Sequence, residues 1–206
     1  MAENTSANDF FIIGNNLSLD FINTEFVENG ERKDALSDFA SLLSWAVAAN
    51  LLETKQRTKI LHEFGESTAA ASEVFLQALN FRAGLRAMVE GLEKGKKVKP
   101  QILTRINYLL RAQHGYTEIA QTVEGFVKRF RADFKVPSEI LSPVAEAAAD
   151  LLCYGEVQYL KKCENSECIL HFYDTSKNHR RRWCSMKACG NRAKQANFYS
   201  RKKMNQ

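Results

Sequence analysis

Apolar residues recur at helical intervals along most of the first 155 residues. The pattern predicts five helices, over about 34–51, 54–64, 67–94, 100–113 and 137–155. Apolar side chains three or four residues apart line one face of a helix, which can then pack on a core. Asp34 and Thr54 are expected to cap the first two helices, Gly65 to end the second, and Pro100 to occupy the first turn of the fourth.

The apolar faces of these predicted helices supply the candidate core. Its members are expected to be Leu36, Phe39, Leu43, Val47, Val74, Leu76, Leu79, Leu85, Met88, Ile102, Ile106, Leu109, Leu110, Val144, Ala147, Ala148, Leu151 and Leu152. Cys153 lies on the same apolar stripe as the last of these residues, so we expect a buried, unreactive thiol.

Strands are expected in only a few places. Residues 10–13 form a short apolar run before a Gly-Asn-Asn turn, which predicts a strand. Residues 17–26 fit a helical interval or a strand alternation, and we favour the helix. Residues 116–122 and 126–134 alternate around Glu124-Gly125 and predict a hairpin.

Composition narrows the fold class. The chain has 206 residues, of which 45% are hydrophobic and 26% charged, so it can bury a core and is not disordered throughout. With 3 Pro and 10 Gly, a sandwich of many short strands is disfavoured. No apolar run is long enough for a bilayer span, and the polar residues 1–8 do not resemble a signal peptide. We expect a cytoplasmic protein of mainly α (α+β) class, with no membrane contact.

Positive charge is concentrated at the C-terminal end. Residues 161–206 contain 12 Lys and Arg against 3 Asp and Glu, a net charge of +9, whereas the other 160 residues carry −4. A basic segment joined to a slightly acidic body indicates a module that binds a polyanion.

The same segment holds four of the five cysteines. Cys163 and Cys168 form one Cys-x4-Cys pair, and Cys184 and Cys189 form a second pair after fifteen residues. Four thiolates satisfy tetrahedral zinc and leave no open position for water, so the predicted site is one structural Zn²⁺. Four reduced thiols that simply pack, or an iron–sulfur cluster, are the alternatives. His171 and His179 are expected to lie outside the coordination sphere.

A treble-clef-like arrangement would place the first cysteine pair on a knuckle, then a hairpin, and the last ligand at the start of a basic helix. Arg192 and Gln195 could then read base edges in a major groove, while clustered cations contact phosphates. The candidate nucleic-acid-binding residues are Arg180, Arg181, Arg182, Arg192, Lys194, Gln195, Arg201, Lys202 and Lys203. RNA binding, with Trp183, Phe198 or Tyr199 stacked on bases, and a zinc-stabilised protein-interaction module remain open alternatives.

Several polar residues interrupt the apolar N-terminal helices. They are Asp20, Asn23, Thr24, Arg82, Arg86 and Asn107. Buried polar groups need partners, so a structural network, for example one in which Asp20 pairs with Arg82, explains them. The functional alternative is a small-molecule site in which Arg82 or Arg86 meets an anionic effector.

The C-terminal segment resembles the CGNR zinc finger. The motifs that carry the resemblance are the cysteine spacing, Phe172-x-Asp174-x-Ser176, residues 182–186 and the tetrad Cys189-Gly190-Asn191-Arg192. The rest of the chain resembles the ABATE domain. This resemblance is carried by residues 19–24, by Asp34-x-Leu36 followed by Trp45, by residues 81–86 and by Ile106-Asn107. The resemblance implies a stress-induced bacterial transcription regulator, associated with the nucleoid, in which the four cysteines of the finger bind zinc.

These observations predict two domains. Residues 1–157 would form a mainly helical, effector-binding domain with minor β elements, and residues 158–206 a small zinc finger that binds DNA. No phosphate loop, nucleophile elbow or histidine pair at metal spacing occurs, so we do not expect an enzyme. A single finger offers a small DNA interface, which makes a homodimer through the N-terminal domain a further hypothesis.

Overall fold

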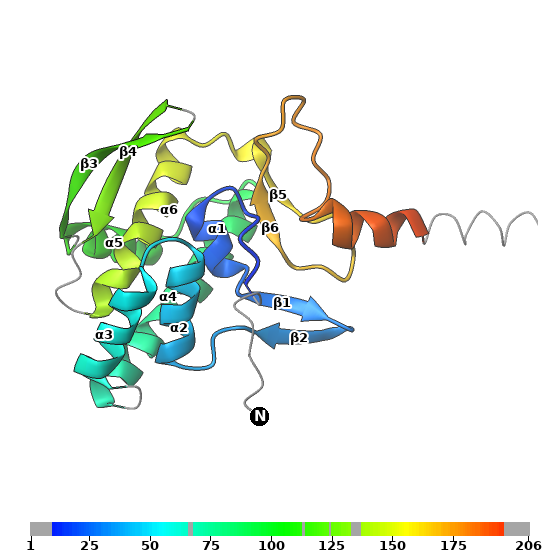
Figure 1. Ribbon diagram of the computed structural model, residues 1–206. Helices are drawn as coiled ribbons and strands as arrows, with labels where there is room; N and C mark the ends of the chain where they lie inside the picture. Colours follow the sequence, from blue (N-terminus) through cyan, green and yellow to red (C-terminus); the bar gives the residue numbers. More distant parts are fainter. Residues whose placement is uncertain (1–9, 66–67, 113, 124, 133–136, 196–206) are drawn as a thin grey trace, which may run out of the picture.

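The computed structural model describes residues 10–65, 68–112, 114–123, 125–132 and 137–195, and their fold is α+β (Figure 1). The α-helices are α1 (Leu17–Ile22), α2 (Phe39–Ala48), α3 (Thr54–Phe64), α4 (Ala69–Leu92), α5 (Pro100–Arg111) and α6 (Ser142–Tyr154). The strands are β1 (Glu25–Glu28), β2 (Glu31–Asp34), β3 (Gly115–Thr122), β4 (Gly125–Ala132), β5 (Leu160–Lys162) and β6 (His171–Tyr173). Short 3₁₀ turns cover Pro137–Leu141 and Val157–Tyr159, and a π turn covers Met186–Gly190.

The strands of the described residues pair as three separate antiparallel hairpins. β1 pairs with β2, β3 with β4, and β5 with β6, with Glu25 opposite Asp34, Gly115 opposite Ala132 and Leu160 opposite Tyr173. The β3–β4 hairpin confirms the alternation seen in the sequence. The β1–β2 hairpin was not predicted, because its second strand is polar and exposed along its whole length.

The predicted helices α3, α4, α5 and α6 are confirmed within a few residues. Helix α3 ends at Gly65, whose φ of 70° suits glycine. The helix predicted to begin at residue 34 begins later, because α2 starts after Asp38. The Asp38 carboxylate accepts the Ser41 N–H in a capping box. Asp34 is instead the last residue of β2, and its carboxylate accepts a hydrogen bond from Arg82.

The main core joins α1, α2, α4, α5 and α6. Its largest fully buried side chains include Trp45, Phe21 and Phe81, and Phe21 packs its ring 4.9 Å from that of Trp45. Two predictions about burial were wrong. Leu76 lies on the outer face of α4 and is 58% exposed, and Cys153 is exposed on α6.

The segment Phe10–Ile13 is not a strand, contrary to the prediction. At its end, the Ile13 and Gly14 N–H groups donate to the Asp20 carboxylate, at 2.8 and 2.7 Å, instead of to a strand partner. The segment then enters α1, which is shorter than the predicted helix because the chain turns into β1 after Asn23.

The C-terminal module packs on this body. Figure 1 shows the β5–β6 hairpin beside α1, and the β1–β2 hairpin extending along the same side of the molecule. The Tyr173 N–H donates to the Gly14 carbonyl at 2.7 Å, which ties β6 to the segment that precedes α1. Across the described helices, none is both long and apolar enough to cross a bilayer.

Candidate metal centre and its basic surface

The four cysteines of the C-terminal module converge on one point. The Sγ atoms of Cys163, Cys168, Cys184 and Cys189 all lie within 4.8 Å of one another, and all four residues are buried. The Cys168–Cys184 and Cys184–Cys189 sulfur distances are 3.8 and 3.6 Å. Four sulfurs at tetrahedral zinc distance lie about 3.8 Å apart, whereas a disulfide needs about 2 Å. The cysteines therefore form a structural zinc site for one ion, as the sequence predicted.

Local structure positions each ligand pair. Cys163 and Cys168 lie in the loop of the β5–β6 hairpin, where the Cys163 N–H donates to the Leu170 carbonyl at 2.9 Å. Cys189 lies in the π turn, whose N-cap Ser185 accepts the Ala188 N–H. Two sulfurs also accept N–H groups: the Cys184 N–H donates to Cys163 Sγ and the Asn165 side chain to Cys189 Sγ, both at 3.4 Å. Such bonds stabilise the thiolate form that binds metal.

Gly190 of the CGNR tetrad has a steric role. A Cβ atom built at this position would collide with Met186 Sδ and would lie 3.2 Å from Trp183 Cδ1. A larger residue at this position would therefore displace the Met186 side chain and press on the Trp183 ring.

The fifteen residues between the cysteine pairs do not form a second hairpin, contrary to the prediction. They contain β6 and then a long loop organised by Asp174, which is fully buried. The Asp174 carboxylate accepts from Lys161 Nζ at 2.6 Å, from the Ser176 hydroxyl at 2.6 Å and from the Arg181 N–H at 2.9 Å. Burial alone would raise the pKa of Asp174, but these donors outweigh it and lower the pKa below the ordinary value.

Arg181 has structural partners rather than a free guanidinium. Its Nη2 donates to the carbonyls of Ile13 and Cys184 at 2.9 and 2.6 Å, its Nε donates to the Trp183 carbonyl at 3.1 Å, and its guanidinium lies 4.0 Å from the Phe172 ring centroid. Burial lowers its pKa. Its Nε and Nη2 donors thus bind carbonyls of the finger and the body, which is a structural role and not the phosphate contact expected from the sequence.

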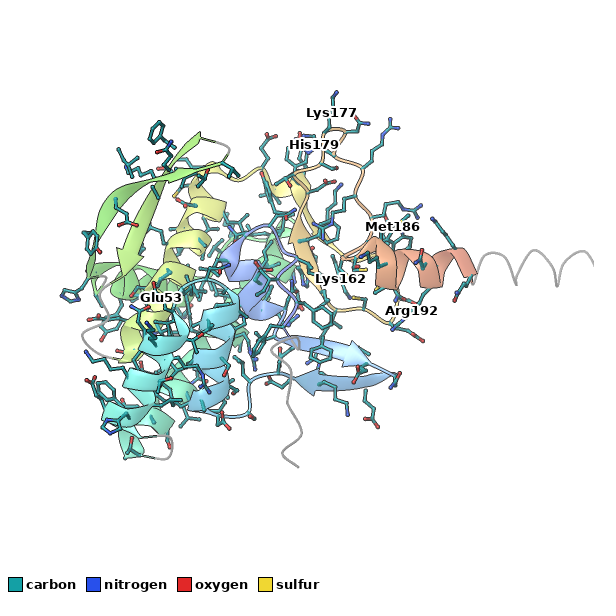
Figure 2. All side chains as sticks on the ribbon, viewed as in Figure 1. Glu53, Lys162, Lys177, His179, Met186 and Arg192 are labelled. Carbon is teal, nitrogen blue, oxygen red and sulfur yellow. The ribbon has the colours of Figure 1, made fainter. Side chains whose placement is uncertain are left out.

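The other basic candidates in the described part of the chain are exposed. They are Arg180, Arg182, Arg192 and Lys194, with Gln195 also exposed, and Lys162, Lys177 and Lys187 join them on the same module. Arg182 is partly engaged, since its Nη2 lies 2.6 Å from the Glu164 carboxylate on the surface. Figure 2 shows Lys177 on the loop after β6 and Arg192 on the helix after Cys189, both on the side away from α3.

Three of the predicted phosphate contacts, Arg201, Lys202 and Lys203, lie outside the described residues, as do the predicted stacking residues Phe198 and Tyr199.

A buried interface joins the finger to the body. Asn23 is fully buried, and its amide donates to the His171 carbonyl at 2.8 Å while its oxygen accepts the His171 N–H at 2.9 Å. Arg86 donates to the Ile169 carbonyl at 3.3 Å and also to the Ile22 carbonyl. The first strand residue of β6 is thereby held by side chains of the body.

Three of the polar candidates, Thr24, Arg82 and Arg86, bind each other or nearby carboxylates, as a structural network requires. Arg82 binds the Asp34 carboxylate at 2.7 and 2.5 Å and the Thr24 hydroxyl at 2.7 Å. Arg86 Nε binds the Glu25 carboxylate at 3.0 Å. The predicted pairing of Arg82 with Asp20 was wrong, because β2 brings Asp34 to Arg82.

Asp20 and Asn107 lie apart from that arginine pair. Burial raises the pKa of Asp20 to about 6, although N–H groups of Gly14 and Ile13 and the charge of Arg181 oppose the shift. Asn107 is exposed on α5. The six polar candidates therefore do not converge on one pocket.

The histidines of the module are not metal ligands. His179 stacks on Tyr159 with ring centroids 3.8 Å apart, and His171 is buried with its Nε2 3.4 Å from a carboxylate oxygen of Glu93. Glu25, Asp34 and Glu93 were missed as partners. The signal in the sequence was Arg82 and Arg86 on an apolar helix, since two buried guanidinium groups require carboxylates from elsewhere.

Comparison with known families gives two matches that divide the chain. Residues 15–155 match the ABATE family, described as "Putative stress-induced transcription regulator", and residues 159–202 match the CGNR zinc finger. Comparison with curated proteins gave no match.

Proposed function

Because the chain belongs to the ABATE family and carries a CGNR zinc finger, we propose that it is a transcription regulator that binds duplex DNA through this finger. The supporting observation is the set of exposed cations on a module braced by four cysteines and by the buried Asp174. A fixed backbone lets such cations meet phosphates without a large ordering cost.

Two kinds of contact are proposed. Arg180, Arg182 and Lys194 are exposed and would bind phosphates, which positions the protein but reads no sequence. Arg192 and Gln195 follow the last zinc ligand at helical spacing, and their side chains can form paired hydrogen bonds with guanine and adenine edges in a major groove.

The body is proposed to modulate this binding. Asn23, Arg86 and Arg181 connect the body to the finger through hydrogen bonds to backbone groups. An effector that prefers one arrangement of the body would therefore change the position of the finger and its DNA affinity.

The test is selection of random duplex DNA by the zinc-loaded full-length protein, followed by binding measurements on the enriched sequence. We expect Arg192→Ala/Gln195→Ala to relax the selected motif, with a loss of about ten-fold or more in specific affinity. The matched control is Arg111→Ala/Gln121→Ala, which removes the same side chains from exposed positions of α5 and β3 and should leave the motif unchanged.

Salt dependence separates the alternatives. DNA binding through phosphates predicts that the logarithm of affinity falls steeply with the logarithm of salt concentration. Salt-sensitive binding without any enriched motif, together with preference for single-stranded RNA, would refute the DNA proposal in favour of RNA binding. No binding to either nucleic acid would favour a protein-interaction module.

A further inference from the structure

A cavity of about 520 Å³ lies between α4 and α5, on the body and away from the zinc site. Phe81, Met88, Val98 and Ile102 supply apolar side chains to its wall. Gly91 of α4 also lines it, and the nearest side-chain atom to a Cβ built at that position is Lys96 Cβ, at 3.8 Å. The volume is in the range of sites that bind small organic molecules.

The charged side chains around this cavity all have one sign. Lys96, Lys97, Lys99 and Arg105 line it, and no Asp or Glu is among its lining residues. The three lysines are exposed, and the ion pairs seen among the described residues do not include them. This concentration of positive charge is notable because residues 1–160 carry a net charge of −4.

The start of α5 adds to the positive potential. Lys99 is the N-cap of α5, and its side chain makes no capping hydrogen bond to the first-turn N–H groups. Gln101 and Ile102 of that first turn line the cavity. The uncapped end of a helix of 12 residues favours an anion beside it.

We propose that this cavity binds a small amphipathic carboxylate, with its aliphatic or aromatic part against Phe81, Met88 and Ile102 and its carboxylate among the lysines. The apolar wall contributes affinity through burial, and the lysine ammonium groups select the charge of the head group. This site is distinct from the arginine network that the sequence suggested.

A second copy of the chain fits this surface poorly. A two-fold symmetric contact places the same patch on both partners, so Lys96, Lys97 and Lys99 would face their own copies. Like charges brought together without counter-charges cost free energy. A small anion neutralises the same lysines and fills the apolar wall.

Helix α4 connects the cavity to the finger. Met88 and Gly91 line the cavity, whereas Arg86 of the same helix contacts Ile169 and its C-cap Glu93 contacts His171. A ligand in the cavity is therefore placed to act as the effector in the proposed function. That role rests on the proposed function, but the binding site does not.

The test is isothermal titration calorimetry of the zinc-loaded full-length protein with three ligands: decanoate and decyltrimethylammonium below their micelle concentrations, and decan-1-ol below its solubility limit. Decanoate should bind about ten-fold or more tightly than the alcohol, since its carboxylate can accept charge-assisted hydrogen bonds from several lysines at once, and the cation should not bind. Gly91→Leu should abolish decanoate binding by filling the cavity, while its melting temperature reports that it remains folded.

A charge-matched pair of variants tests the head-group site. Lys96→Gln/Lys97→Gln/Lys99→Gln should weaken decanoate about ten-fold or more and leave decan-1-ol unchanged. Lys55→Gln/Lys59→Gln/Lys94→Gln has the same net charge but alters no lining residue, so it should bind decanoate like the parent protein.

Three results would overturn the proposal. They are equal affinity for the three amphiphiles, decanoate binding that survives Gly91→Leu, and dimerisation through this face that Gly91→Leu abolishes. Calorimetry needs no DNA, so failure of the site can be distinguished from failure of DNA binding. A change in DNA affinity on adding decanoate, absent in Gly91→Leu, would extend the proposal to regulation.

Discussion

Replacing Asn23 with alanine should weaken the attachment of the finger to the body by removing a fully buried contact between them. The Asn23 side chain donates to the His171 carbonyl and accepts the His171 N–H, at 2.8 and 2.9 Å, and no part of Asn23 is exposed. Alanine leaves both backbone groups of His171 without these partners, in a site where neighbouring side chains exclude water.

The magnitude follows from those two groups. An unpaired buried donor or acceptor costs about 1–3 kcal/mol, so the loss of both predicts a destabilisation of about 2–6 kcal/mol. The measurement is urea-induced unfolding of the zinc-loaded protein, with hydrogen exchange of the peptide that spans β6 as the local readout. The His171 amide should exchange faster than in the parent protein, because its acceptor is gone.

Asn107→Ala is the matched control, because Asn107 is exposed on α5 and should be replaced with little effect. A destabilisation by Asn23→Ala below about 1 kcal/mol, with unchanged exchange in β6, would refute the reasoning. It would mean that water or another group satisfies the His171 backbone.

Two further predictions concern pH and metal. The pKa of Asp20 is raised from 3.8 to about 6, so the folded state holds this proton more tightly than the unfolded state; the resulting stabilisation is full below the unfolded value and is lost as the pH rises to about 6. The free energy of unfolding of the parent protein, minus that of Asp20→Asn, should fall by up to about 3 kcal/mol between pH 4 and 7, as measured by paired urea titrations. If this difference stays constant with pH, the prediction is contradicted. Chelation of zinc should shift the fluorescence of Trp183 beside the cysteines but not that of Trp45, which is fully buried in the separate core of the body. Single-tryptophan variants would measure each signal, and an equal shift of both would show that the two cores unfold together.

The sequence determined the features that depend on neighbours along the chain. Helices α4 and α5 follow from apolar residues at helical spacing, and the β3–β4 hairpin from alternation around a turn. The zinc ligands were predictable because few chemical roles suit four cysteines in two close pairs. In each case the spacing alone limits which residues can lie on one face or around one ion.

Only the tertiary structure decided the partners of the buried polar groups. Asp34 had the pattern of a helix cap, yet it binds Arg82, which is 48 residues away in the chain. Arg181 lies within a basic run that indicated phosphate binding, yet its guanidinium binds the Ile13 carbonyl, 168 residues away. A local pattern shows that a group is polar or charged. Which acceptor satisfies that group depends on the packing of distant segments, and the same packing places the lysines of the loop before α5 around an apolar cavity.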